Sequence, residues 1–283
     1  MLLALAVALL GALVTGPGPA QAASPAAVVS RAMWVWDTPE PEQLVAFAVA
    51  HDVDEIFLSV PVRATSSLQL PRLRASITQA HAAGIRVSAL GGDPGWIDDA
   101  SWAVTNWLTP ALAVGGFDGV HLDVEPHGHP SWQSDRAGTV SRYLDMLSVL
   151  VTKAGRGRHV EADIAFWYDQ VPVGRSTLDA AVLSRVSGVS VMAYRNTAAG
   201  PDGTLELAAP ALRAAAAARK RARVGQETTY LGDEPYQRKQ TFHGQSTAQL
   251  ETQAAAIDGA LGDTAGYGGL AFHSYAGWAA LRP

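Results

Sequence analysis

The stretch Phe117-Asp118-Gly119-Val120-His121-Leu122-Asp123-Val124-Glu125-Pro126 decides the fold and points to the site. Side chains alternate across a β-strand, so His121, Asp123 and Glu125 share one face and the apolar residues between them share the other. A buried carboxylate must be paired, hydrogen-bonded or protonated, so three polar groups on one buried face indicate a functional site. A satisfied polar cluster inside a barrel is the alternative. Parallel (β/α)8 barrels keep their chemistry at the carboxyl ends of their strands, where Asp123 and Glu125 fall.

Eight apolar, strand-like runs alternate with helix-like stretches along the chain. We predict strands at residues 32–37, 55–61, 85–90, 117–125, 159–167, 188–194, 223–228 and 269–275. Helices are predicted at 41–50, 70–83, 141–153, 205–221 and 247–261, where apolar residues recur with a period of about 3.6 residues. This alternation in a 283-residue chain predicts an α/β fold, a single-domain (β/α)8 TIM barrel over residues 31–283.

The start of the chain is typical of a secreted protein. Residues 2–14 form an uncharged apolar run, and Ala20-Gln21-Ala22 matches a signal-peptide cleavage pattern. We therefore expect residues 1–23 to be a signal peptide, residues 24–30 a linker, and the mature protein to be extracellular. The run is shorter than the about 20 apolar residues of a transmembrane helix, so no stable membrane insertion is expected. A retained N-terminal anchor is the alternative.

Charge and cysteine content narrow the possible partners. The net charge is −5, and the one dense basic cluster, Arg219-Lys220-Arg221-Ala222-Arg223, follows an Ala-rich helix whose dipole it would complement. Nucleic acid is therefore not an expected partner. The chain has no cysteine, so core packing must stabilise it without disulfides. We expect a monomer.

Asp118-Gly119-x-x-x-Asp123-x-Glu125 resembles the D-G-x-D-x-D-x-E signature of glycoside hydrolase family 18, the chitinase-like TIM-barrel superfamily. The resemblance implies a divergent member that acts on a carbohydrate, with Glu125 as the general acid that protonates the glycosidic oxygen. It also implies that Asp123 orients the N-acetyl group of the substrate, which acts as the nucleophile. His121 stands where the signature has its first inner Asp, which removes one negative charge beside the pair.

A second motif falls on the sixth predicted strand. Val191-Met192-Ala193-Tyr194 resembles the M-x-Y-D element of the same family, and the resemblance implies that Tyr194 supports the N-acetyl group. Arg195 replaces the acidic residue of that element. A barrel tyrosine that bonds only to backbone is the alternative for Tyr194.

Glu227 opens a second mechanism. Retaining barrel glycosidases with catalytic residues after strands four and seven use one glutamate at each place, about 5 Å apart, as acid and nucleophile. Glu125 and Glu227 occupy these two places in the predicted strands. A nucleophilic Glu227 therefore stays open beside substrate assistance, as does a merely substrate-binding or surface role.

Other residues at predicted strand ends are candidates for substrate binding. They are Trp36, Asp37, His121, His127, Asp163, Trp167, His273 and Tyr275. Asp163 interrupts an apolar run, so it is either catalytic support or half of a buried ion pair. Six tryptophans could either stack on sugar rings or pack in the core: Trp34, Trp36, Trp96, Trp132, Trp167 and Trp278. Trp278 resembles the tryptophan that floors the family 18 sugar site.

A metal site is the remaining chemical alternative. His121, Asp123, Glu125, His127 and His129 crowd into nine residues, and alternating strand positions can supply metal ligands. The prolines and glycine in the second half of this stretch make it a loop, so we predict no metal and no cofactor. The sequence thus predicts an enzyme that cleaves a glycosidic bond in a polysaccharide or glycan. A catalytically silent carbohydrate-binding barrel is the first alternative and a metal-dependent hydrolase the second.

Overall fold

A closed barrel of eight parallel strands forms the centre of the structure, a computed structural model that describes residues 30–283. The strands are β1 (Arg31–Val35), β2 (Glu55–Ser59), β3 (Arg86–Gly91), β4 (Gly119–Leu122), β5 (His159–Ala165), β8 (Gly188–Met192), β9 (Arg221–Glu227) and β10 (Tyr267–His273). Their order around the barrel is β1-β10-β9-β8-β5-β4-β3-β2. Each predicted strand overlaps one of them, so the (β/α)8 TIM barrel is confirmed. The predicted signal peptide and almost all of the linker lie outside the described residues.

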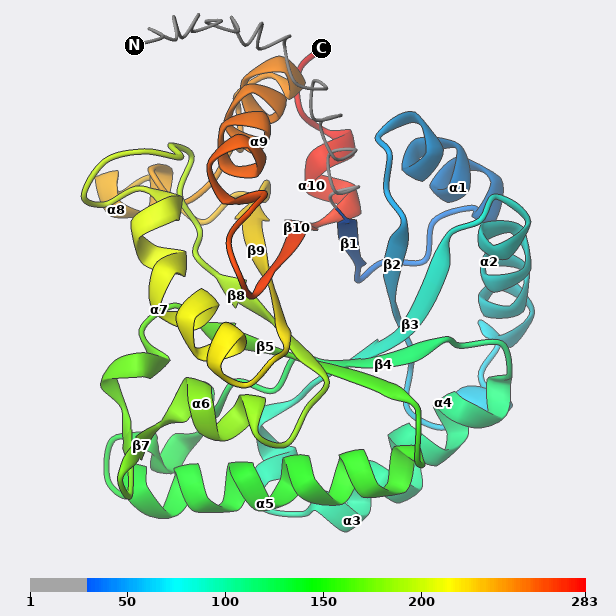
Figure 1. Cartoon of the computed structure of the whole chain (residues 1–283). Helices are drawn as coiled ribbons and strands as arrows, with labels where there is room; N and C mark the ends of the chain where they lie inside the picture. Colours follow the sequence, from blue (N-terminus) through cyan, green and yellow to red (C-terminus); the bar gives the residue numbers. More distant parts are fainter. Residues whose placement is uncertain (1–29) are drawn as a thin grey trace, which may run out of the picture.

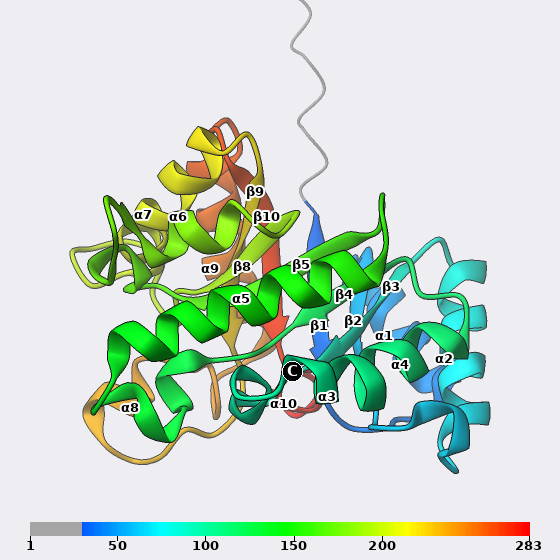
Figure 2. The same ribbon diagram turned by 90° about the horizontal axis from the view of Figure 1, so that it is seen from below.

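Helices form a ring around the barrel (Figure 1). They are α1 (Pro41–Ala50), α2 (Leu70–Ala82), α3 (Ala100–Ala103), α4 (Thr109–Val114), α5 (Arg136–Ala154), α6 (Leu178–Leu183), α7 (Thr204–Ala217), α8 (Pro235–Arg238), α9 (Thr247–Leu261) and α10 (Tyr275–Ala279). A short antiparallel hairpin, β6 (Pro172–Val173) and β7 (Ser176–Thr177), precedes α6. The strand arrows in Figure 2 point toward the end of the barrel where α3, α8 and α10 lie. The carboxyl ends of the strands therefore carry these loops and short helices.

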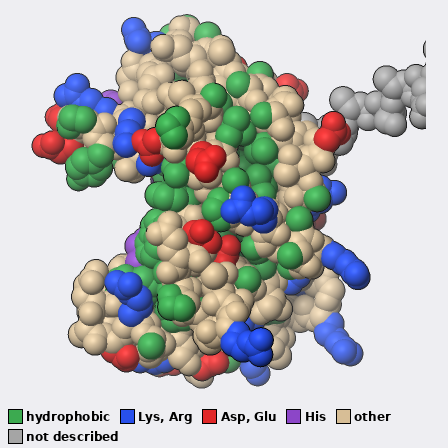
Figure 3. All heavy atoms as spheres, turned by 60° about the vertical axis from the view of Figure 1, so that its left-hand side comes forward, with side chains coloured by type: hydrophobic (Ala, Val, Ile, Leu, Met, Phe, Trp, Pro, Cys, Tyr) green, Lys and Arg blue, Asp and Glu red, His purple; other side chains and the backbone are tan. Residues whose placement is uncertain are grey.

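The prediction that the basic cluster after α7 complements the helix dipole is wrong. The cluster leads into the barrel strand β9, which contains Arg221 and Arg223. Arg219 has a positive φ of 55°, which ends the helical path, and β9 begins at Arg221. Lys220 donates to the carbonyl of Val186 at 2.5 Å, and Arg223 points into the barrel interior. The Lys220 and Arg223 side chains therefore bind groups within the protein. Figure 3 shows acidic and basic side chains interspersed over one face of the molecule.

The helices also bear on membrane insertion. Within residues 30–283, no helix is both long and apolar enough to cross a bilayer.

An ion network fills the barrel interior below the carboxyl ends of the strands. Arg223 donates to Glu161 Oε2 at 2.5 Å and to Glu55 Oε2 at 2.6 Å, and all three residues are buried. The hydroxyls of Ser88 and Ser190 donate to the remaining oxygens of Glu55 and Glu161, at 2.7 and 2.6 Å. Burial pushes the pKa of Glu161 up, but the charge of Arg223 and hydrogen bonds from His159 and Ser190 together hold that pKa well below its usual range. The network joins β2, β5 and β9 across the barrel.

We predict that Arg223→Met destabilises the fold by about 3–5 kcal/mol, because Glu161 loses its buried cation and Glu55 keeps only the exposed Arg86, 2.9 Å away. Urea denaturation at neutral pH measures the loss. Arg223→Lys is the matched control: it keeps a positive charge between the two carboxylates and should lose less. Equal urea midpoints for wild type and Arg223→Met would contradict a structural role for the network.

Candidate active site

The polar face of residues 117–126 points into the barrel. His121 is fully buried, whereas Asp123 and Glu125 are half-buried, and the apolar residues between them join the core outside the barrel. The strand is shorter than predicted: β4 ends at Leu122, so Asp123 and Glu125 follow it. These two carboxyl groups therefore sit where the chain leaves the barrel and side chains can reach solvent.

Asp163 of β5 is the hub of the inner site. Its Oδ2 accepts a hydrogen bond from the indole of Trp34 at 3.1 Å, and its Oδ1 lies 2.9 Å from His121 Nε2. Burial raises the pKa of Asp123 well above its usual range, and the charges of Asp163 and then Glu125 add to this effect. A hydrogen bond between the carboxyl groups of Asp123 and Asp163 also favours the protonated form of Asp123.

Glu125 has the properties of a proton donor. Burial raises its pKa, the charge of Asp163 raises it further, and His273 opposes the shift. Its Oε1 lies 3.6 Å from His127 Nε2, and the other ring nitrogen of His127 lies 3.2 Å from the hydroxyl of Tyr168. Burial lowers the pKa of His127, which favours the neutral ring. A carboxylic acid with a raised pKa beside neutral groups suits general acid catalysis.

Glu227 is held by contacts to both of its carboxylate oxygens. Its Oε1 accepts hydrogen bonds from the amides of Thr228 and Thr229 at 2.8 and 2.6 Å and from the Thr229 hydroxyl at 2.7 Å. Its Oε2 lies 2.9 Å from His273 Nδ1. Trp36 donates to His273 Nε2 at 2.9 Å, so the proton of the neutral ring sits on Nδ1, toward Glu227. With only 2% exposure, the Glu227 carboxyl group is buried as well as held in place.

Tyr194 follows β8 and is half-buried among the carboxylates. Burial raises its pKa, with the charges of Glu227 and Asp163 as the next causes. Its ring lies 6.3 Å from that of His273. Arg195 instead turns to Asp202, which it meets at 2.7 Å. The structure therefore brings Tyr194 to the site and takes the arginine away from it.

Three other predicted residues lie around the rim. Asp37 is exposed, and Tyr275 begins α10 with its ring 5.2 Å from that of Phe47 in α1. Trp167 packs beside His127, with ring centres 5.2 Å apart. Only Trp167 thus reaches a neighbour of Glu125.

Trp278 does not line the site, as the resemblance implied. It lies in the helix α10, is 1% exposed, and packs on the outward-facing Phe272 with ring centres 4.1 Å apart. The helical turn after Ser274 points its indole away from the barrel mouth.

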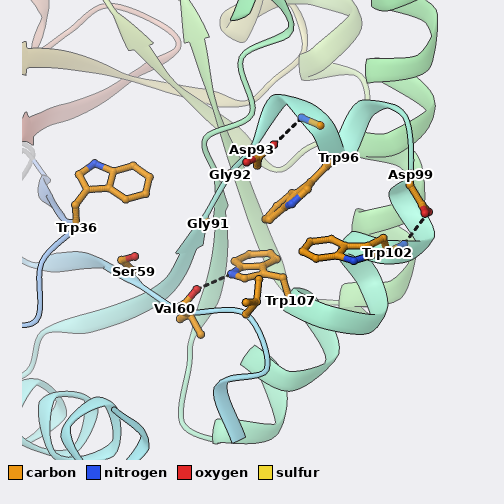
Figure 4. Close-up of a pocket in the computed structure, with 12 residues that line it drawn as sticks. Trp36, Ser59, Val60, Gly91, Gly92, Asp93, Trp96, Asp99, Trp102 and Trp107 are labelled. Atoms are coloured by element: carbon orange, nitrogen blue, oxygen red, sulfur yellow. Dashed lines mark hydrogen bonds between the residues drawn. The ribbon is translucent and has the colours of Figure 1, made fainter. Parts of the chain in front are cut away.

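A pocket of about 410 Å³, here called the tryptophan pocket, opens beside the carboxylates at the ends of β1, β2 and β3. Trp36 lies on one side, and Trp96, Trp102 and Trp107 lie on the other (Figure 4). Trp102 and Trp107 are absent from the predicted site because they stand five residues apart, a spacing that does not share a face in an α-helix. A π-helical turn at Val104–Leu108 brings them together.

Tyr143 and Tyr168 are also absent from the predicted site. Both are fully buried, and among their charged neighbours are Asp163, Asp123 and Glu125, which add to burial in raising the pKa of each. Tyr143 comes from α5, outside the barrel, so no strand-end pattern indicates it. Its hydroxyl has no hydrogen-bond partner within residues 30–283.

The candidate metal ligands are directed to separate partners. His121 faces Asp163, and His129 lies 2.9 Å from Asp98 Oδ2. In the part of the chain that is described, no three His, Asp or Glu side chains gather in a way that could hold a metal ion.

Two glycines at the end of β3 connect the tryptophan pocket with the site. A Cβ at Gly91 would overlap the Trp107 ring, and one at Gly92 would overlap the backbone carbonyl of Asp123. Only glycine lets the chain pass between the indole and the acidic loop.

We predict that Gly92→Ala destabilises the protein by about 1–3 kcal/mol and lowers activity, because the new methyl group displaces the Asp123 backbone. Gly259→Ala in α9 is the matched control, since a Cβ there meets no atom within 4 Å and alanine favours helix. Thermal unfolding and turnover compare the two variants. A Gly92→Ala protein as stable and active as Gly259→Ala would refute the close approach.

Comparisons with known proteins agree with this architecture. No family model and no curated protein matches the sequence. A chitinase from Bacteroides thetaiotaomicron superposes with a TM-score of 0.58 at 10% identity, over 88% of this chain and 90% of that one. A chitinase from Rhizomucor miehei gives 0.55 at 16% identity, over 87% and 94%. A GH113 β-1,4-mannanase gives 0.56 at 9% identity, over 87% of each chain. At such identities the likeness shows the fold, and the predicted resemblance to the chitinase-like barrels is confirmed at that level.

Proposed function

We propose that this protein is a glycoside hydrolase that cleaves a glycosidic bond in a polysaccharide or glycan, with Glu125 as the general acid. The observation that carries the proposal is the raised pKa of Glu125 at the carboxyl end of β4, caused by burial and by Asp163. A group that stays protonated nearer neutral pH can give its proton to a leaving oxygen. The structural neighbours named above, chitinases and a mannanase, support the same class of reaction.

The contacts of Glu227 favour substrate assistance over a two-glutamate mechanism. A nucleophile needs a free oxygen lone pair directed at the anomeric carbon, but Glu227 is buried, its Oε1 accepts three hydrogen bonds, and its Oε2 lies 2.9 Å from His273 Nδ1. Asp123 and Tyr194 lie among the remaining acidic groups, where they could orient and stabilise an N-acetyl group of the substrate. We therefore assign Glu227 to fixing His273 and Trp36.

The alternatives make different demands. A silent carbohydrate-binding barrel would not need a carboxylic acid of raised pKa, and Glu125 therefore favours an enzyme. A metal-dependent hydrolase lacks support from the arrangement of the described ligands. The signal-peptide pattern of residues 1–23 supports action outside the cell.

We predict that Glu125→Gln lowers turnover by about 100-fold or more, since it removes the proton donor and keeps its shape. Reducing-end release from a panel of glycans measures the loss, with the exposed Glu206→Gln as the matched control. Wild-type turnover should fall as pH rises through the raised pKa of Glu125, because only the protonated form is active. Full activity of Glu125→Gln on a cleaved glycan would reject the assignment.

We predict a severe loss of turnover when the Asp123 carboxyl group is replaced and a mild loss when that of Glu227 is replaced. Asp123→Asn should lower turnover by about 100-fold or more while raising stability at neutral pH, because it replaces a carboxyl group whose ionised form is disfavoured by burial and by Asp163. Glu227→Gln should reduce turnover mildly, about 10-fold, by loosening His273. Steady-state kinetics and urea denaturation test both variants. A far larger Glu227→Gln defect that external azide rescues would establish the two-glutamate mechanism instead.

A further inference from the structure

His127 is brought to Glu125 by the turn that follows β4. The 3-10 turn Pro126–Gly128 folds the chain back, and the amide of Gly128 donates to the carbonyl of Glu125 at 3.0 Å. In this turn His127 Nε2 lies 3.6 Å from Glu125 Oε1. The backbone therefore sets the contact, and the two side chains need little ordering to make it.

Three aromatic rings enclose the His127 ring. The ring centres of Trp167, Tyr168 and Trp132 lie 5.2, 6.1 and 6.4 Å from its own, and each ring meets it edge to face. Burial lowers the pKa of His127, so the neutral ring is favoured. A neutral imidazole carries one hydrogen, either on Nδ1 or on Nε2, and the other nitrogen is an acceptor.

Tyr168 decides which nitrogen of His127 carries the hydrogen. Its hydroxyl lies 3.2 Å from His127 Nδ1 and has no other hydrogen-bond partner within residues 30–283. Tyr168 is fully buried, and burial raises its pKa well above the usual range, so the hydroxyl keeps its hydrogen. A buried hydroxyl whose hydrogen lacks an acceptor is destabilising. The hydroxyl therefore donates to Nδ1, which leaves the ring hydrogen on Nε2, the nitrogen nearer to Glu125.

An N–H group at this position stabilises the ionised form of Glu125. In the proposed reaction the O–H bond of Glu125 breaks and a new O–H bond forms on the glycosidic oxygen. The bond from the anomeric carbon to that oxygen breaks with its electron pair going to the oxygen, and the N-acetyl oxygen supplies a new pair to the anomeric carbon. The negative charge left on Glu125 is then within reach of the His127 N–H. At 3.6 Å the contact is longer than a hydrogen bond, and contacts of this kind tighten when the catalytic complex forms.

We infer that His127 is a positioning residue for the general acid: Tyr168 fixes its hydrogen on Nε2, and this N–H binds Oε1 of Glu125 as the proton leaves from Oε2. The inference rests on the proposed function, because it takes Glu125 to be the acid. It gives His127 a role that acts through Glu125, in place of the expected contact with the substrate.

Other titratable groups also face Glu125, from the elements packed around it. They are Asp123 in the same loop, Asp163 of β5, His273 of β10, Tyr143 of α5, and Tyr168 and Tyr194 at the ends of β5 and β8. Burial and then Asp163 raise the pKa of Glu125, and His273 lowers it. All of these groups stay in place in a His127 variant, so a difference between His127 variants reports on His127.

Steady-state kinetics of His127 variants test the role. His127→Leu removes the donor, so it should lower kcat about 10-fold or more with little change in KM. Without the N–H the ionised Glu125 is less stable, so its pKa rises and the alkaline limb of the kcat profile should move upward by about one pH unit. His127→Gln should restore most of both effects, because its Nε2 stands the same number of bonds from the backbone and donates.

The exposed His243→Leu is the matched control and should change neither kcat nor the pH profile. A His127→Leu enzyme with the kcat and pH profile of wild type would overturn the inference. So would a loss that His127→Gln does not reduce.

A double-mutant cycle tests the part played by Tyr168. Tyr168→Phe should lower kcat about 3-fold in the wild-type background, because either nitrogen of His127 can then carry the hydrogen, and should have no effect beside His127→Leu. Urea denaturation confirms that each variant is folded. Equal effects of Tyr168→Phe in both backgrounds would mean that Tyr168 acts without His127, which contradicts the inference.

NMR of the full chain separates this inference from the proposed function. The nitrogen shifts of His127 should place the hydrogen on Nε2, and the Glu125 carboxyl carbon should titrate at higher pH in His127→Leu than in wild type. A protein that shows both results but cleaves no glycan would defeat the proposed hydrolase and leave the His127–Glu125 contact standing. Cleavage that requires Glu125, with the His127 hydrogen on Nδ1, would defeat the inference alone.

Discussion

Negative charge stacked along the inside of one barrel is the constraint on which this structure depends. In the lower layer, Glu55 and Glu161 share the cation Arg223, Arg86 adds a second cation at Glu55, and serine hydroxyls satisfy the remaining oxygens. Within residues 30–283 the upper layer has no lysine or arginine partner: Asp163 meets His121, Trp34 and the carboxyl group of Asp123. Charge is therefore compensated where the barrel needs rigidity, and left partly uncompensated where the strands end.

His121 stands between the two layers. Its Nε2 faces Asp163 above and its Nδ1 lies 3.9 Å from Glu161 below, while its ring stacks on Phe57 with centres 3.6 Å apart. An aspartate there, as in the family signature, would put a third carboxylate between Asp163 and Glu161. The histidine fits because the layer beneath already holds a carboxylate on the same axis.

The sequence predicts those features that depend on strand period and strand ends. The alternation in residues 117–125 put His121, Asp123 and Glu125 on one inward face, and all eight strands were located, because both follow from local pattern. Side chains that arrive from outside the barrel were not predicted. Tyr143 comes from a helix, and Trp102 and Trp107 line one pocket because of a π-helical turn that no spacing rule of the α-helix contains.

Ion pairs between residues distant in sequence were not predicted either, because local patterns do not show which strands carry the partners. Arg223 looked like part of a helix-end cluster because its partners Glu55 and Glu161 are distant in sequence. Glu227 matched a nucleophile by position, yet the sequence could not reveal that threonine amides bond to its Oε1 and that His273 lies beside its Oε2. Position along a barrel strand predicts where a carboxylate lies, not how tightly its neighbours hold it.

The hydrogen bond from Trp36 to His273 makes the ring nitrogen Nε2 an acceptor. An indole nitrogen can only donate, so this bond and a doubly protonated imidazole exclude one another. Any change that turns the His273 ring would therefore release Trp36, a wall of the tryptophan pocket. By the reciprocity of linked equilibria, a ligand that holds Trp36 in place would also hold the His273 ring in its present orientation.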